Sequence, residues 1–302
     1  MKAFFIDHFV LPLPENHRFP MAKYERLRDA VQQHNLAELH VPNPATNEQI
    51  LRCHDRAYLD KVTHGTLSQK EIRRIGFPWS PYLVERSRRS VGATIDASLT
   101  ALNEGIAVNL AGGTHHACSD HGEGFCVFND VAIAARDLQA KKLVKNVVII
   151  DCDVHQGNGT AQITSDDPSI FTFSIHGEKN FPFRKFASNI DIGLDENTGD
   201  DEYLDLVEEG TKRAIYCSNA DLAIYISGAD PYIGDRLGKL AITKDGLAKR
   251  DRTVINHIQQ AGLPVAVVMG GGYAPNIDDI VSIHLETVKI ASAISREYRE
   301  IQ

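Results

Sequence analysis

Five apolar segments recur along the chain, and each is followed by residues with polar or chemically active side chains. They cover residues 106–113, 147–150, 170–175, 221–228 and 264–269. The segment 147–150 has the sequence VVII and no polar position, which is typical of a strand covered on both faces of a parallel sheet. We therefore expect these segments to form the inner strands of one sheet.

Between the apolar segments lie stretches with helical spacing of apolar residues. They cover residues 21–34, 81–103 and 129–138. Pro81 stands where the first turn of a helix tolerates proline, and Asn129 or Asp130 is a suitable N-cap for the third stretch. Strands that alternate with helices predict an α/β domain with a mostly parallel sheet and helices on both of its faces.

Length and composition favour one large domain. The chain has 302 residues, 43% of them hydrophobic, and no linker-like or repetitive tract. Because α/β domains commonly run past about 250 residues, we expect residues 1–302 to form a single domain. The formal net charge of −8 disfavours nucleic-acid binding, and we expect Arg86, Arg88 and Arg89 to form a solvated face of their helix.

The cysteines and the N-terminal segment predict a cytoplasmic protein. The five cysteines include no C-x-x-C pair, which favours a reducing compartment over a disulfide framework. We expect Cys118, Cys126 and Cys152 to be packing residues and not metal ligands. Residues 1–19 lack the features of a signal peptide, and no stretch is long enough to span a bilayer.

The segment DCDVH, directly after the strand 147–150, carries the sharpest chemical signal. In extended backbone, side chains at i and i+2 share a face, so Asp153 and His155 can converge on one ion while Asp151 projects alongside. Buried carboxylates without a compensating cation would be costly. Alone, however, the pattern is only suggestive, because aspartates also cap strands and begin helices.

The ends of the other four segments strengthen the metal interpretation. They carry Thr114-His115-His116, His176, Asp230 and Gly270-Gly271-Gly272-Tyr273. Each group has an ordinary structural explanation by itself, such as a buried histidine pair or a tight glycine turn. In open α/β sheets, however, ligands bind outside the carboxyl ends of the strands. All these groups would then meet at one edge, and the polar segment 181–201 is predicted to be an irregular loop beside them.

Several segments resemble those of the histone deacetylase family of zinc-dependent amidohydrolases. They are GGTHHACSDHGEGFCVFND, IIDCDVHQGNGT, SGADPYIGDRLGKLAIT and GGGYAPN, in that order. The motifs DVHQGNG, GDRLG and TGDDEYL are most similar to class IV members. The resemblance implies the arginase/deacetylase fold, in which one α/β domain with a mostly parallel sheet of eight strands carries the site on carboxyl-end loops.

The resemblance also implies a metal centre and its chemistry. Asp153, His155 and Asp230 would bind zinc and leave a position open for water and substrate, although Fe²⁺ also suits such ligands in the cell. Because the later D-x-D of binuclear manganese ureohydrolases is missing after Asp230, that reading of the same fold is disfavoured. Main-chain oxygens of Asp151, Asp153, His155 and Ile175, with the hydroxyl of Ser174, resemble a structural K⁺ site.

The paired histidines and the tyrosine match the family's catalytic set. His116 would be the general base, His115 its electrostatic partner, and Asp151 the acceptor for the ring of His115. Tyr273 would donate to the developing oxyanion. Asn158 stands where many deacetylases have an aspartate behind the second histidine. The amide orients the ring without adding charge, so the pKa of His116 is expected to be lower than with an aspartate.

The substrate is the least determined part of the prediction. Gly124, Phe125 and Phe181 resemble the wall of a tunnel for an acylated lysine stem, and Arg18 resembles an arginine of an inner product channel. The first prediction is removal of an acetyl or longer acyl group from lysine in a protein or peptide. Alternatives are an acetylpolyamine deacetylase, which a net charge of −8 would suit, and a non-catalytic acyl-lysine binding module. The sequence leaves the acyl length and the oligomeric state open.

Overall fold

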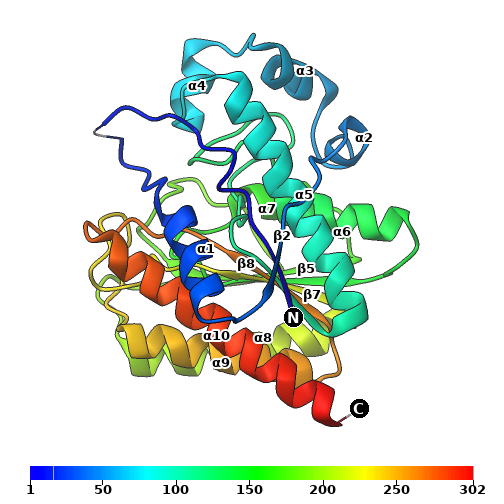
Figure 1. The fold of residues 1–302 in the computed structure, drawn as a ribbon, viewed down its shortest axis with the longest axis vertical. Coiled ribbons are helices and arrows are strands. Elements are labelled where there is room, and N and C mark those ends of the chain that lie inside the picture. The colour runs from blue at the N-terminus through cyan, green and yellow to red at the C-terminus, as the bar shows by residue number, and fades with distance from the viewer. Residues whose placement is uncertain (16, 302) are drawn as a thin grey trace.

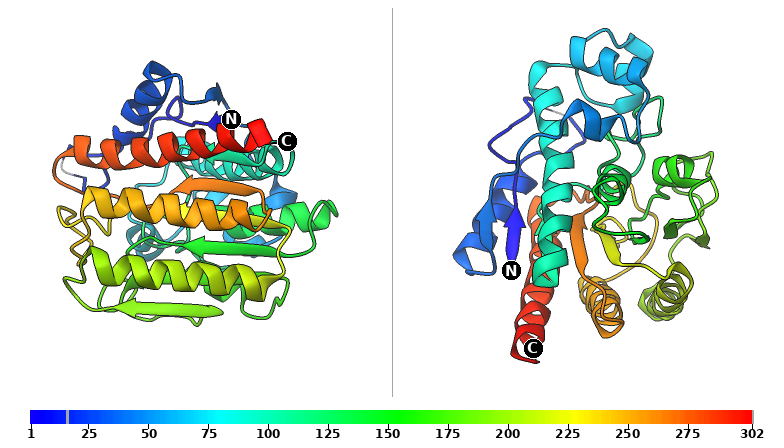
Figure 2. Two further views of the ribbon diagram at one scale, coloured as in Figure 1. Left: turned by 90° about the horizontal axis from the view of Figure 1, so that it is seen from below. Right: turned by 90° about the vertical axis from the view of Figure 1, so that its right-hand side faces the viewer.

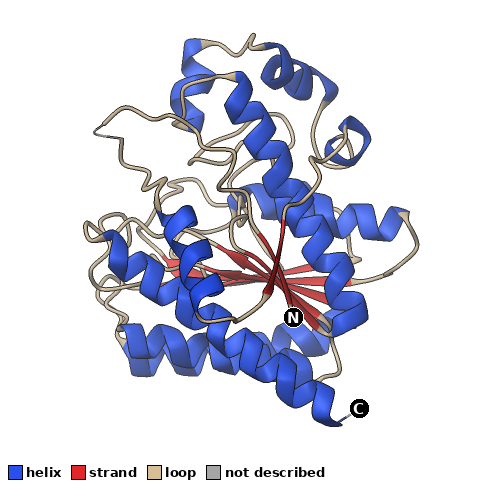
Figure 3. Cartoon of the chain, in the orientation of Figure 1, coloured by secondary structure: helices blue, strands red, loops and turns tan. Residues whose placement is uncertain are grey.

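A parallel sheet of eight strands forms the centre of the computed structural model, which describes residues 1–15 and 17–301. Figure 1 shows the fold, and Figure 3 shows the strands lying between helices on both sides. The spatial order is β2-β1-β3-β8-β7-β4-β5-β6, and every neighbouring pair is parallel. The strands are β1 (Lys2–Phe4), β2 (Glu38–His40), β3 (Ile106–Asn109), β4 (Val147–Asp151), β5 (Ile170–Gly177), β6 (Ile190–Leu194), β7 (Leu222–Ser227) and β8 (Val265–Met269). The predicted fold class is confirmed.

Ten helices of the described residues surround the sheet (Figure 2). Helices α5 and α6 pack together on one face, while α8, α9 and α10 form a row on the other, with α1 against α10. The helices are α1 (Lys23–Gln33), α2 (Asn47–Ile50), α3 (Arg56–His64), α4 (Gln69–Ile75), α5 (Pro81–Glu104), α6 (Asp130–Ala140), α7 (Asn158–Thr164), α8 (Asp200–Ser218), α9 (Lys244–Gln260) and α10 (Ile277–Ile301).

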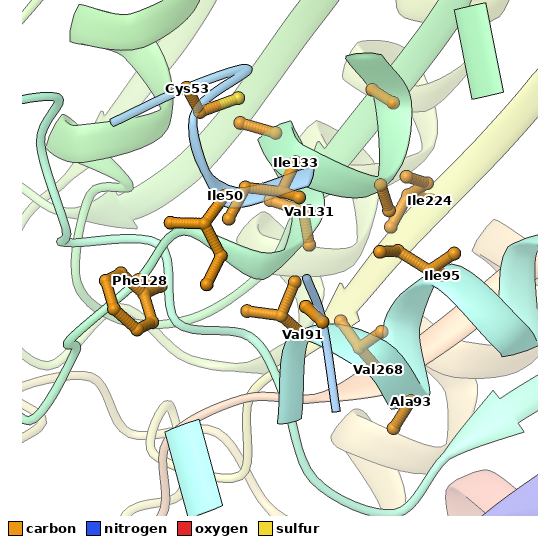
Figure 4. Close-up of a cluster of buried hydrophobic side chains, with 14 of the residues drawn as sticks. Ile50, Cys53, Val91, Ala93, Ile95, Phe128, Val131, Ile133, Ile224 and Val268 are labelled. Carbon is orange, nitrogen blue, oxygen red and sulfur yellow. The ribbon is translucent and has the colours of Figure 1, made fainter. Parts of the chain in front are cut away.

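Two hydrophobic cores, one on each face, hold these layers together. Alternate residues of a strand point to opposite faces, so Ile149 belongs to the core under α5 and α6, whereas Ile150 belongs to the core under α8, α9 and α10. This explains why the segment 147–150 has no polar position. Figure 4 shows part of the first core, where side chains of α2, α5, α6 and the sheet pack together: Ile50, Val91, Ile95, Val131, Ile133, Ile224 and Val268.

The predicted helices agree closely with the observed ones. Helix α5 begins at Pro81 behind the N-cap Ser80, whose side chain accepts from Leu83 N. Helix α6 begins behind Asn129, whose side chain accepts a hydrogen bond from Ala132 N. Each cap satisfies a backbone N–H that a helix start otherwise leaves unpaired. The capping signals therefore place both helix starts correctly.

Two sequence expectations were wrong. The segment 181–201 contains strand β6, whose burial alternates because it lies at the sheet edge, and only residues 181–189 and 195–199 are irregular. The arginines of α5 do not form a solvated face. Arg86 is buried and donates to Ile6 O, Arg88 donates to Ala45 O, and Arg89 donates to Pro42 O. They attach α5 to the loops that cross it, which no local pattern reveals.

The cysteines are thiols, and most of them are buried. All five cysteines are free, and Cys53, Cys118, Cys126 and Cys152 are buried. Burial raises the pKa of the Cys118 thiol to about 12, so the side chain is an inert packing group. Among the described residues, no helix combines the length and the apolar character that a membrane crossing requires.

Candidate active site

Four adjacent strands bring the predicted residues to one edge of the sheet. Strands β3, β8, β7 and β4 are neighbours, and their carboxyl ends lead to His115-His116, Tyr273, Asp230 and the segment 151–155. The chain order of these strands differs from their spatial order. The long connection that follows β3 therefore meets the loops that follow β7 and β8. This is the crevice in which open α/β sheets bind their ligands.

Asp153, His155 and Asp230 form a compact buried cluster. Their ligand atoms all lie within 4.8 Å of one another. His155 Nδ1 is 3.0 Å from Asp153 Oδ1 and 3.1 Å from Asp230 Oδ2. Two carboxylates and one imidazole that converge without a fixed cation fit a divalent ion such as zinc, which accepts mixed N/O ligands. These three residues could therefore hold the metal.

The pKa values of the cluster are those expected of a site that binds a cation. Burial and the nearby charge of Asp153 together raise the pKa of Asp230 to about 7. Burial alone would lower the pKa of His155, but hydrogen bonds to Asp153 and Asp230 outweigh it and raise this pKa to about 10. The imidazolium thus supplies the positive charge that a metal ion would otherwise provide.

Backbone groups hold the two carboxylates in place. Gly271 N donates to Asp153 Oδ2 at 2.6 Å, and Val154 N donates to Asp230 Oδ1 at 3.0 Å. A side chain at position 271 would collide with the Asp230 carboxylate. The glycine run after β8 is therefore required by this close approach, and not only by a turn.

Each of the paired histidines has its own partner on the side away from the cavity. His115 Nδ1 donates to Asp151 Oδ2 at 2.6 Å, and His116 Nδ1 donates to Asn158 Oδ1 at 2.7 Å. Burial lowers the pKa of His116 well below its usual value, and the neighbouring His115 and His155 lower it further. Burial opposes a charge on His115 as well, but the Asp151 carboxylate raises its pKa to about 9.

The structure reveals a carboxylate behind Asn158 that sequence reasoning missed. Asn158 Nδ2 donates to Glu123 Oε1 at 2.6 Å, and Glu123 Oε2 pairs with Arg74 Nε at 2.9 Å. The sequence predicted no charge behind His116, but a negative charge lies behind Asn158, one residue further from the ring. Glu123 stands in the GEGF segment already noted for its neighbours, but nothing in its local sequence indicates this contact.

A second missed residue is Arg250 of α9, which is fully buried beneath the metal cluster. Its Nη1 donates to Gly228 O at 2.7 Å and to Cys152 O at 3.3 Å. Both carbonyls belong to the segments that carry the proposed metal ligands. The guanidinium pairs with Asp251 at 2.8 Å, so its charge is compensated.

Tyr273 lies beside the metal cluster. Its ring is 6.3 Å from the ring of His155, and Asp235 Oδ2 accepts from its backbone N at 2.6 Å. Burial raises the pKa of the phenol well above its usual value, and the charge of Asp230 adds to this. The hydroxyl therefore stays protonated and remains a hydrogen-bond donor.

A cavity of 570 Å³ leads from the surface to these residues. Gly124, Phe125 and Phe181 line it, as the resemblance implied, together with His116 and His155. Gly124 has a φ of +58°, and a Cβ there would lie 2.7 Å from the His116 ring, so only glycine keeps this passage open. Arg18 also lines the cavity, but it is exposed at the mouth and does not occupy an inner channel.

The residues of the expected potassium site lie beside the metal cluster. Asp151 of β4 and Ser174 of β5 are register partners in the sheet, and the Ser174 hydroxyl is 3.0 Å from His176 Nδ1. His176 is buried on β5 and is not part of the metal cluster. The K⁺ site itself stays a prediction.

Comparisons with known proteins agree with this architecture. The histone deacetylase domain matches residues 17–288. An uncharacterized protein of Picosynechococcus sp. is 45% identical, covering 91% of this chain and 93% of the relative. Histone deacetylase 2 of Arabidopsis thaliana is 28% identical (90% and 73%), and histone deacetylase clr6 of Schizosaccharomyces pombe is 30% identical (90% and 72%).

Solved structures share the same fold. The HDA15 HD domain has a TM-score of 0.82 at 20% identity, covering 97% of this chain and 88% of that one. An HDAC homolog complexed with SAHA has a TM-score of 0.82 at 24% identity, covering 97% and 84%. Fold and site thus define a hydrolytic deacetylase with a buried Asp-His-Asp group that could hold a metal ion. The chain belongs to the histone deacetylase family.

Proposed function

We propose that this protein is a zinc-dependent amidohydrolase that removes an acetyl or longer acyl group from the lysine side chain of a protein or peptide. The observation that carries the proposal is the convergence of three buried ligands, two histidines and a protonated tyrosine at the inner end of one cavity. Three ligands leave one position of a tetrahedral zinc site open. Hydrolysis requires that open position for water and substrate.

The residues around the metal position divide the work of amide hydrolysis. A zinc ion bound by Asp153, His155 and Asp230 would acidify water and polarise the substrate carbonyl. His116 lines the cavity, and its Nδ1 proton is held by Asn158. Its free Nε2 can take the proton of the attacking water and return it to the leaving amine.

Two further residues stabilise the charges that develop during the reaction. Asp151 holds the ring of His115, and the positive charge of that ring favours a negatively charged intermediate nearby. The Tyr273 hydroxyl can donate to the developing oxyanion. Because the site is buried, these interactions act in a low dielectric and are stronger than in water.

The cavity wall supports an apolar stem with a polar end. The rings of Phe181 and His116 are 5.0 Å apart, and those of Phe125 and Tyr273 are 5.9 Å apart. A lysine-like chain between such rings loses its contact with water, while its amide reaches the polar residues at the inner end. A non-catalytic binding module would not need the metal ligands and the tyrosine, all of which are present.

Four finer assignments belong to the same proposal. The Asn158–His116 pair supports class IV as the subclass, and the Asp151–Ser174 neighbours support a structural K⁺. The native ion can be Zn²⁺ or Fe²⁺, since both accept this ligand set. Five free cysteines support a reducing cytoplasmic location.

A hydrolysis screen with metal analysis of the same sample tests the proposed function. The substrates are acetyl-lysine peptides, fatty-acyl-lysine peptides and acetylpolyamines. We expect turnover of acyl-lysine peptides by protein with about one bound metal ion per chain. Turnover of acetylpolyamines alone would transfer the activity to small-molecule substrates, and hydrolysis of no amide by metal-loaded protein would overturn the proposal.

A further inference from the structure

The mouth of the cavity carries the opposite charge to the protein as a whole. The chain has a formal net charge of −8, yet Arg18, Arg73 and Arg74 all line the cavity. Among its described lining residues there is no aspartate or glutamate. A substrate that approaches this site therefore meets a local positive charge.

Only two of the three arginines are available to a substrate. Arg74 Nε is paired with Glu123 Oε2 at 2.9 Å, and that carboxylate also holds Asn158. Arg18 and Arg73 are exposed, and within residues 1–15 and 17–301 neither forms an ion pair.

The local structure keeps these arginines at the mouth. Arg73 lies in the last turn of α4, where the helix dipole favours a cation. His17 Nε2 donates to Gly76 O at 2.9 Å, and its Nδ1 accepts from Phe19 N at 3.1 Å. This ring joins the segment on both sides of Arg18 to the end of α4, so the two exposed arginines are held beside the same opening.

We propose that Arg18 and Arg73 select acyl-lysine side chains that are flanked by aspartate or glutamate in a peptide or protein. This inference rests on the proposed function and specifies its substrate class. Carboxylates beside the modified lysine would lie near the guanidinium groups while the acylated stem fills the cavity, and arginine pairs well with carboxylates. Cationic chains, including acetylated polyamines, would instead meet like charge, which costs affinity.

Peptides that differ only in flanking charge test the inference. We expect kcat/KM for an acetyl-lysine peptide with flanking Asp and Glu to exceed that of its Lys/Arg-flanked counterpart by about tenfold at low ionic strength. The difference should lie mainly in KM and shrink at high ionic strength, because salt screens exposed charges. The substitutions R18Q and R73Q together should bring the ratio close to one, and R18E with R73E should invert it.

Matched controls separate this effect from a change in overall charge. Arg213 of α8 and Arg252 of α9 are exposed and lie outside the cavity lining, so R213Q with R252Q should keep the wild-type ratio. A wild-type ratio at or below one, or a ratio unaffected by R18E with R73E, would overturn the inference. Efficient hydrolysis of acetylpolyamines would do the same. If the wild-type protein hydrolyses none of these amides, the result contradicts the proposed function instead.

Discussion

Asn158 donates a hydrogen bond to Glu123 while its carbonyl oxygen accepts one from His116. The Glu123 carboxylate can only accept, so the NH₂ group of Asn158 must face it and the oxygen must face His116. The His116 proton is thereby placed on Nδ1, and Nε2 stays free toward the cavity. An acidic residue that does not contact the histidine therefore fixes the tautomer that a general base requires.

The Glu123→Gln substitution tests this arrangement. The new amide can donate to Asn158, which allows Asn158 to rotate and stabilises the other tautomer of His116. We expect kcat to fall by about tenfold to a hundredfold with little change in KM, as for other residues that support ligands or bases from behind. Steady-state kinetics and metal content measure this, and an unchanged kcat in the folded, metal-loaded variant would contradict the arrangement.

The Tyr273→Phe substitution removes the proposed oxyanion donor and little else. Asp235 contacts the backbone N of Tyr273 and not its hydroxyl, so the loop should be preserved. We expect kcat to fall by about a hundredfold or more, with unchanged metal content and thermal stability. Turnover near the wild-type rate would exclude this function for the hydroxyl.

Arg250 is expected to stabilise the folded protein. Replacing it with Met removes the hydrogen bonds to Gly228 and Cys152 and leaves Asp251 buried without its cation. Such uncompensated charges destabilise proteins by about 3–5 kcal/mol. Urea unfolding measures the loss, and the Arg250→Met/Asp251→Leu pair should be less destabilised than Arg250→Met alone. Equal stability of wild type and Arg250→Met would show that the buried pair contributes little.

His54 makes folding sensitive to mild acid. It is buried and accepts a hydrogen bond from Asn129 N at 2.9 Å, and burial lowers its pKa to about 4. As the pH falls below the unfolded value near 6.5, the unfolded chain binds the proton first. The stability that neutral His54 contributes is therefore fully present above that value. It is lost between about pH 6.5 and pH 4, by on the order of 3 kcal/mol.

The matched variant for this effect is His54→Gln, whose amide oxygen can still accept from Asn129. Unfolding free energies measured at neutral pH and near pH 5 should fall less steeply in the variant than in the wild type. Equal slopes for the two proteins would show that His54 does not carry the acid sensitivity.

The sequence predicted those parts of the molecule that local patterns specify. The buried runs before Asp151, Asp230 and Tyr273 defined inner strands, and parallel pairing then required their carboxyl ends to meet. Strands β1 and β2 have three residues each, too few for periodicity to indicate them.

Contacts between distant segments could not be predicted in the same way. Glu123 and Arg250 are recognisable only once the chain is folded, because their partners lie far away in sequence. Net charge also did not predict the local charge of the site, since −8 for the whole chain coexists with arginines at the cavity mouth. The position of Arg18 was likewise decided by the fold and not by its motif.

Metal removal and reconstitution test the proposed function most directly. We expect the chelated protein to lose hydrolysis of acetyl-lysine peptides and to regain it with about one equivalent of Zn²⁺. The Asp230→Ala variant should neither retain stoichiometric zinc nor recover activity, because it lacks one of the three converging ligands. Full activity in metal-free wild type, or in Asp230→Ala without bound metal, would contradict a metal-dependent mechanism at this site.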